Sequence, residues 1–385
     1  MSELTLMAVS DIILDTPRPA EQFFELIKPV FAEADAVIGH AEVYYTSRGV
    51  STFIDPRYPS TPSPIESLKA LPYAGFDVMT MASNHAWDAG APGVEDTING
   101  LDEYGILHTG AGMNLDEAHK PAILERKGTK IGVLSYNCVG PVGSWASDAK
   151  PGCAYVAVDT VYESNFPGCP PMIRSYPEPE TLARMEKEIR ELREQVDVVV
   201  VAIHKGIGFL PVKLADYEFA VSHAAIDAGA DIILGHHAHI LKGVEIYKGK
   251  VILHGMGHFT NVLEHGMGND KPPEEAAKFL YNFKTQHGGP FYLNMDASEV
   301  PFMAPDENGV LMEELTMVAK IGVSGGKIDR VSILPALIRK DKKPEVQRRG
   351  SAYGDLIFRF LENSTKYAFL NAKLAWDGDE IVVSE

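Results

Sequence analysis

Short runs of apolar and β-branched residues recur along the chain, and many of them end in small or polar residues. Runs of this length suit strands that are buried on both faces, as in the middle layers of an α/β protein. The runs cover residues 4–9, 36–38, 76–81, 130–135, 196–203, 232–234, 250–253 and 331–334.

Segments with helical periodicity lie between several of these runs. Residues 180–195 are the clearest, because charges of both signs alternate around an apolar stripe. The other helix-like segments are residues 64–71, 91–104, 214–228 and 353–363. Strands that alternate with helices predict an α/β fold with mostly parallel strand pairing.

Two stretches, residues 140–177 and 265–306, are rich in Pro and Gly and have little periodicity. Irregular segments of this length in compact domains are usually functional, so we expect long loops over the body of the fold. A last strand-like run, residues 328–338, precedes the final helix. This order predicts a single domain over residues 1–385, with the C-terminal part packed on the same body.

Composition and charge limit the classes of partner. The 385 residues are 45% hydrophobic and 23% charged, which is typical of a globular chain. The formal net charge of −18 disfavours nucleic acid, since polyphosphate would be repelled, and three cysteines are too few for a disulfide framework or a cysteine zinc site. No run approaches the ~18 apolar residues of a spanning helix and we find no signal peptide, so we expect a cytoplasmic protein that does not bind membranes.

Histidine, carboxylate and amide side chains follow five of the predicted strands. In α/β sheets, ligands and catalytic groups gather at the carboxyl ends of strands. A mixed set of oxygen and nitrogen donors suits Mn, Fe or Zn better than Ca. The residues at these strand ends are Asp11, His40, Glu42, Asn84, His85, His204, His236, His237 and His239.

Spacing refines two of these motifs. In an extended segment His237 and His239 would point to the same face, and His236 would point away unless a local turn breaks the alternation. Asp88 follows His85 by three residues and could accept a hydrogen bond from it. Such a pair favours the protonated imidazole that a general acid needs.

Each residue also has a structural interpretation. Asp11 alone would be a turn former, Asn84 a helix N-cap with Asp88 in the first turn, and His204 a core histidine. Their occurrence in order at successive strand ends favours function. For His40, His254 and His258, pocket lining and ordinary loop packing both stay open.

Several segments together resemble a known family. The motifs SNHAWDAG (residues 83–90) and GADIILGHHAHILKGVE (residues 229–245) are the most specific, and IGHAE (residues 38–42) and VVVVAIHKG (residues 198–206) accompany them. The chain resembles the CapA/PgsA-type proteins of capsule and poly-γ-glutamate biosynthesis, within the calcineurin-like metallophosphatase superfamily. The resemblance implies a four-layer α/β/β/α sandwich with a dinuclear metal site at one edge of the two sheets.

The resemblance also implies site roles. Two divalent metal ions (Mn, Fe or Zn) would lie ~3.5–4 Å apart and make hydroxide available near neutral pH. His85, with Asp88, would protonate the leaving group. The implied metal ligands are Asp11, Glu42, Asn84, His204, His237 and His239.

The chain departs from the family pattern at three places. His40-Ala41-Glu42 stands where Asn-Leu-Glu is usual, residues 255–259 replace Ser-Leu-Gly-Asn-Phe, and Lys205 follows His204 where Trp is usual. These changes predict a pocket for a small anionic substrate. The candidate substrate-binding residues are His40, Lys205, His236, His254 and His258.

The function predicted from these features is metal-dependent hydrolysis of a phosphoester by metal-bound hydroxide. A dinuclear centre polarises a carbonyl as it does a phosphoryl oxygen, so an amide hydrolase of γ-glutamyl type is an alternative. A non-catalytic accessory protein of capsule or poly-γ-glutamate biosynthesis is the other alternative.

Overall fold

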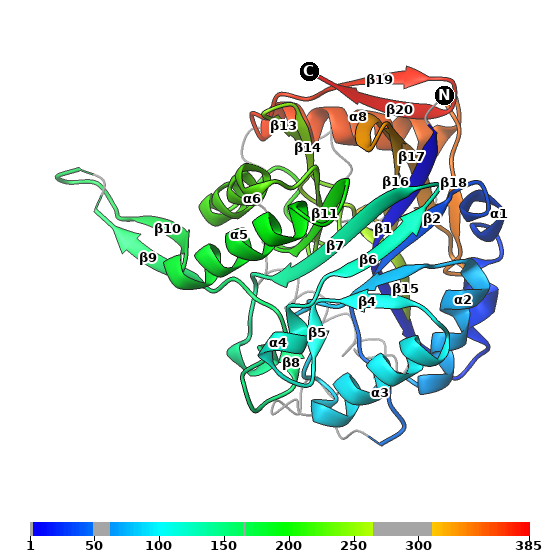
Figure 1. Cartoon of the computed structure of the whole chain (residues 1–385). Helices are drawn as coiled ribbons and strands as arrows, with labels where there is room; N and C mark the ends of the chain where they lie inside the picture. The colour runs from blue at the N-terminus through cyan, green and yellow to red at the C-terminus, as the bar shows by residue number, and fades with distance from the viewer. Residues whose placement is uncertain (1–2, 49–61, 165, 265–309) are drawn as a thin grey trace, which may run out of the picture.

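Two large β-sheets form the centre of the molecule (Figure 1). The computed structural model describes residues 3–48, 62–164, 166–264 and 310–385. The larger sheet runs, in spatial order, through β19 (Lys373–Asp377), β20 (Glu380–Ser384), β17 (Lys327–Ile338), β16 (Leu315–Ser324), β1 (Leu4–Asp15), β2 (Ala36–Ala41), β3 (Val78–Thr80) and β4 (Leu107–Thr109), with β15 (His258–Leu263) on β1 and β18 (Pro344–Val346) on β17. The smaller sheet runs through β13 (Val244–Tyr247), β14 (Lys250–Leu253), β12 (Ile232–His236), β11 (Val198–His204), β7 (Thr129–Asn137) and β6 (Ala122–Arg126).

Most of the helices cover the outer faces of the two sheets, and the last one packs against the apolar cluster between the sheets. The α-helices are α1 (Lys28–Phe31), α2 (Ala70–Ala74), α3 (Gly90–Glu103), α4 (Leu115–Ala118), α5 (Pro179–Arg193), α6 (Asp216–Ala228) and α8 (Ala352–Tyr367). Short 3-10 helices lie at Ala20–Phe24, Ile65–Lys69, Val142–Ser144 and Met312–Glu314.

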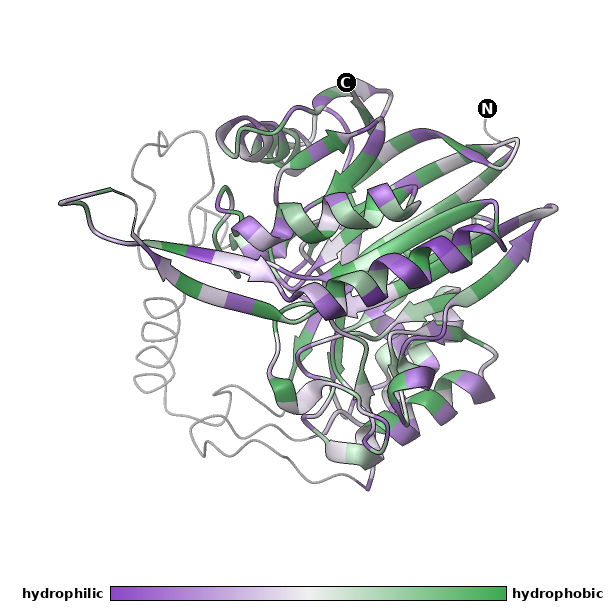
Figure 2. Ribbon diagram, turned by 60° about the vertical axis from the view of Figure 1, so that its left-hand side comes forward, coloured by the Kyte–Doolittle hydropathy of each residue, from purple (hydrophilic) through white to green (hydrophobic). Residues whose placement is uncertain are grey.

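The alternation of side chains along β11 shows how the layers form. Val198 and Val200 face the space between the sheets, where they join Ala8 and Ile38 of the larger sheet in one apolar cluster. Val199 faces the opposite way, into a cluster with apolar residues of α5 and α6. A third cluster lies under α2 and α3, outside the larger sheet. Figure 2 shows the same arrangement, with apolar strands inside and helices that are polar on their outer faces. The predicted four-layer α/β/β/α sandwich is therefore confirmed.

Strand pairing is parallel only in part. β1, β2, β3 and β4 pair in parallel, as do β7, β11, β12 and β14. The C-terminal strands β16, β17, β19 and β20 are antiparallel. Short turns join β16 to β17 and β19 to β20 directly, which antiparallel pairing allows. The prediction of mostly parallel pairing holds for the strands that carry the site and is wrong for the C-terminal part.

Residues 140–177 contain regular structure that the sequence analysis missed. They include β8 (Gly152–Cys153), which pairs with β5 (Ala111–Gly112), and a hairpin of β9 (Val158–Glu163) and β10 (Met172–Pro177). The hairpin extends away from the body of the molecule (Figure 1). Its strands are largely exposed, so they have no buried apolar run to mark them.

Two predictions about organisation are not tested by these features. The stretch at residues 265–306 lies outside the described residues. The single-domain organisation stays a prediction, although β16 and β17 belong to the larger sheet. Within the described part of the chain, no helix combines the length and the apolar character that a membrane crossing requires.

Candidate metal centre

Strand register in the larger sheet places Asp11 between two histidines. Asp11 is the register partner of His40 on β2 and of His258 on β15. The register of β1 shifts between Ala8 and Asp11, which brings the carboxylate level with His40. The prediction that the first strand ends at Asp11 is wrong, because β1 continues to Asp15 through its pairing with β15.

The smaller sheet supplies the facing histidines. His204 and His236 are the last residues of β11 and β12, and they are register partners in this parallel pair. The chain then turns, with positive φ angles of 78° at His237 and 60° at His239. His237 and His239 therefore do not lie on an extended segment. The turn is the exception that the sequence analysis left open for His236, whose ring does not point away and lies 4.2 Å from the ring of His40.

The loop between β3 and α3 brings the remaining predicted residues to the same edge. The Ser83 hydroxyl donates to the Glu42 carbonyl at 2.8 Å and accepts from the His85 N–H at 3.0 Å. This fixes His85 beside Glu42, with 3.7 Å between Nε2 and Oε1. On the other side, the Oδ1 atom of Asn84 is 2.6 Å from Nε2 of His204.

Among the residues that the structure describes, three overlapping groups of side chains could each hold a metal ion. In each group, one ligand atom per residue lies within 4.8 Å of the others. Asp11 belongs to two groups and His204 to two, so the three groups form one continuous centre. The groups are Asp11, His40, His204 and His236; Asp11, His239 and His258; and Glu42, His204 and His237.

The ligand atoms of this centre are suited to coordinate cations, because several of them form no hydrogen bonds with their described neighbours. Asp11 Oδ1, both oxygens of Glu42 and both ring nitrogens of His236 are buried, and within the described residues they have no hydrogen-bond partner. A buried polar atom without a hydrogen-bond partner costs about 1–3 kcal/mol of folding free energy. The presence of several such atoms in one place therefore indicates a bound cation. Carboxylate oxygens and imidazole nitrogens are the donors that Mn, Fe and Zn accept.

Burial and charge shift the pKa values of this centre in opposite directions. Burial, with the Asp11 charge, raises the pKa of Glu42 to about 8. Burial also lowers the pKa of His40 to about 4, so the imidazole is neutral and free to act as a ligand. Burial alone would lower the pKa of His85, but the negative charges of Asp88 and Glu42 outweigh this effect and raise the pKa to about 9. His85 is therefore protonated at neutral pH, and it lies at the partly exposed side of the centre.

The sequence from β1 to β15 carries a family signature. Residues 5–262 match the family described as bacterial capsule synthesis protein PGA_cap, and this range contains every residue of the three ligand groups. The match covers well over half of the chain. The chain belongs to the PGA_cap family.

Relatives of this PGA_cap chain are named for capsule and polymer synthesis. The PGA biosynthesis protein CapA of Bacillus subtilis is 29% identical over 273 residues, which are 71% of this chain and 64% of that protein. The capsule biosynthesis protein CapA of Bacillus anthracis is 29% identical over 51% of this chain and 42% of its own length. A probable polyglutamine synthesis accessory protein of Mycobacterium tuberculosis is 28% identical over 53% of this chain and 50% of that one. The match thus spans less than two thirds of these relatives.

Solved structures give more distant similarities. A phosphatase from Mycoplasma pneumoniae superposes with a TM-score of 0.47 at 14% identity, covering 88% of this chain and 95% of that one. The calcineurin-like phosphoesterase YfkN of Bacillus subtilis gives a TM-score of 0.38 at 11% identity, over 95% and 98%.

The five predicted substrate-binding residues of the PGA_cap chain lie in two separate clusters. His40, His236 and His258 lie within the ligand groups. Lys205 and His254 lie in a second buried cluster, where Lys205 Nζ is 2.9 Å from His254 Nδ1. Their role in substrate binding stays a prediction.

The second cluster includes two acids that the sequence analysis missed. Lys205 Nζ is 3.5 Å from Oε2 of Glu218, which lies in the first turn of α6. His254 Nε2 is 2.9 Å from Oε2 of Glu245 on β13. Lys205, Glu218 and His254 are fully buried. Only tertiary packing joins them, so no sequence spacing could reveal the cluster.

Proposed function

We propose that this member of the PGA_cap family is a metal-dependent hydrolase that acts on phosphoesters of small anionic substrates. The observation that carries the proposal is the gathering of unpartnered carboxylate and imidazole atoms beside a protonated His85. A protein that used this face only for packing would have to bury these polar atoms without compensation.

Two divalent cations, of Mn, Fe or Zn type, fit the donor set. When bound, such cations acidify water and neutralise the charge of a phosphoryl group. The residues that would hold them are Asp11, Glu42, Asn84, His204, His237 and His239. His237 and His239 are partly exposed, whereas Asp11, Glu42 and His204 are fully buried. Substrate would therefore approach from the side of His237 and His239.

The side chains at the accessible face would direct proton transfer. The Nε2 atom of His85 faces the centre, and the Nδ1 atom contacts Asp88 at 2.5 Å. His85 would give its Nε2 proton to the leaving oxygen, and Asp88 would hold the ring in this orientation.

A γ-glutamyl amide is the second candidate substrate. Relatives that are named for PGA biosynthesis and polyglutamine synthesis favour it. The same residues serve this reaction, since His85 would then protonate a leaving amine. A non-catalytic role beside such a synthesis machinery is the remaining alternative.

A substrate panel tests the proposal. The full chain, loaded with Mn²⁺ or Zn²⁺, is assayed against aryl phosphates, phosphodiesters and γ-glutamyl amides. We expect turnover of a phosphoester, a fall of about 10²–10⁴-fold in His85→Asn, and no change in the control His108→Asn, whose histidine pairs with Asp102 elsewhere. Turnover of the amide alone supports the second candidate, and no turnover by a metal-loaded protein contradicts catalysis.

A further inference from the structure

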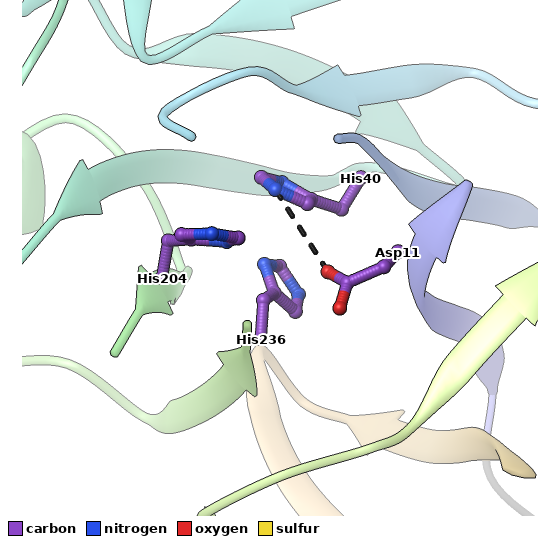
Figure 3. Close-up of side chains that lie close together, drawn as sticks. All are labelled: Asp11, His40, His204 and His236. Atoms are coloured by element: carbon purple, nitrogen blue, oxygen red, sulfur yellow. Dashed lines mark ion pairs between the residues drawn. The ribbon is translucent and has the colours of Figure 1, made fainter. Parts of the chain in front are cut away.

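Four buried side chains meet next to the partly exposed His237 and His239. Asp11 and His40 come from the larger sheet, and His204 and His236 come from the ends of two strands in the smaller one. Figure 3 shows the four side chains pointing toward one another. They are 0–2% exposed, and the ring of His40 lies 5.0 Å from that of His204.

The hydrogen bonds around His40 decide which ring nitrogen is free. The Thr80 hydroxyl donates to the Gly39 carbonyl at 3.1 Å, so its oxygen accepts from His40 Nδ1–H at 2.9 Å. This leaves Nε2 as the lone-pair nitrogen. Nε2 faces Asp11 Oδ1 at 4.0 Å and Glu42 Oε2 at 3.6 Å. These distances are too long for hydrogen bonds. The His40 Nε2 lone pair and the carboxylate oxygens are all acceptors, so a cation between them would satisfy them together.

His236 completes the group. Both of its ring nitrogens are buried, and within the described part of the chain neither has a hydrogen-bond partner. Buried imidazoles normally bond through at least one nitrogen. A cation among Asp11, His40 and His204 would use one of them.

Asp11 faces this group and the outer ones with different oxygens. Its Oδ1 lies toward His40, while its Oδ2 lies 3.3 Å from Nδ1 of His239 and accepts from the His237 N–H at 3.2 Å. Asp11 can therefore serve two positions at once. His204 has Nε2 at 2.6 Å from Oδ1 of Asn84, and its neutral ring offers one lone pair, so it would serve one position only.

We propose that Asp11, His40, His204 and His236 form a cation position of their own, in addition to the pair of the proposed function. Three imidazoles and one carboxylate, closed from solvent, offer nitrogen and oxygen donors that suit Zn²⁺ or a similar divalent metal. The cation would join the strand ends of the two sheets. This inference goes beyond the proposed function, because it requires binding and no hydrolysis.

Metal counting tests the inference on the full chain. The protein is stripped with a chelator, reloaded with Zn²⁺, freed of excess metal and analysed by mass spectrometry of the elements. We expect about three equivalents in the wild type and about two in His236→Gln and in His40→Asn, since each variant removes a ligand of the additional position alone. His254→Gln, which changes an equally buried histidine outside the three groups, keeps three.

Thermal unfolding gives a readout that does not depend on activity. The rise in Tm on adding Zn²⁺ should be smaller in His236→Gln than in the wild type and in His254→Gln. A wild-type count of two or fewer, or equal counts in the wild type and both variants, overturns the additional position. A count of two in the wild type leaves the proposed function standing, whereas a count of zero contradicts both.

Discussion

The Nδ1 atom of His85 lies 2.5 Å from Oδ2 of Asp88, one turn ahead in the loop before α3. The contact leaves Nε2 directed at Glu42, on the side of the predicted metal ligands. Asp88 thereby does two things. It fixes the orientation of the ring, and its charge opposes the effect of burial on the pKa of His85, which is raised to about 9.

Asp88→Asn should lower kcat/KM by about 10–100-fold without changing the metal content. His85 donates a proton only while it is protonated, so activity is lost as pH rises through its pKa. Removing the Asp88 charge lowers that pKa, and the alkaline limb of the kcat/KM profile should move to lower pH. An unchanged pH profile would show that Asp88 has no influence on the acid.

Metal should stabilise the fold. Zn²⁺ at about 100 times its dissociation constant should add about 2.7 kcal/mol to the free energy of unfolding, because it compensates buried donor atoms that the unfolded chain exposes to water. Calorimetry of the stripped and reloaded protein measures the resulting rise in Tm. Ca²⁺ is the control, since it prefers oxygen ligands and should have a smaller effect. Identical Tm values with chelator and with Zn²⁺ contradict this prediction.

The buried pair of Lys205 and Glu218 should matter for stability. Lys205→Met removes one partner and leaves Glu218 and His254 buried without the ammonium, which should cost about 3–5 kcal/mol of unfolding free energy. Lys248→Met is the matched control. Lys248 pairs with Asp227 on the surface, so its loss should cost less than about 1 kcal/mol. Urea unfolding compares the two variants, and equal effects would contradict a structural role for the buried pair.

Gly235 precedes His236 at a close approach of β12 and β14. A Cβ atom there would lie 2.4 Å from the carbonyl oxygen of His254 and 2.5 Å from that of Leu253. Gly235→Ala should therefore push the two strands apart, at a cost of about 1–3 kcal/mol, and displace His236. Gly143→Ala, where a Cβ meets nothing within 4 Å, should be neutral. Chemical unfolding with a parallel zinc count measures both effects, and a fully stable Gly235→Ala variant would contradict the packing.

The sequence allowed the central strands and the edge that carries the site to be predicted. The apolar runs of β11 and β12 are buried on both faces, so they have the continuous hydrophobic pattern of inner strands. Because parallel strands end at one edge, polar residues after them had to meet, and His204 and His236 do so as register partners.

Other features depend on tertiary structure that no local pattern records. The positive φ angles at His237 and His239 set the direction of their side chains, and neither histidine nor its neighbours signal them. Lys205 follows a predicted ligand and was predicted to bind substrate, yet its ammonium lies beside Glu218, thirteen residues away on α6. The exposed hairpin of β9 and β10 lacked the buried apolar run on which strand prediction depends.

Anomalous diffraction from crystals grown with Zn²⁺ tests the central claim, that this edge of the two sheets binds divalent cations. The account predicts anomalous peaks at the zinc absorption edge, within about 2.0–2.3 Å of side-chain atoms of Asp11, Glu42, His204 and His239. Peaks confined to the surface, or none near these four residues in zinc-saturated crystals, would contradict it.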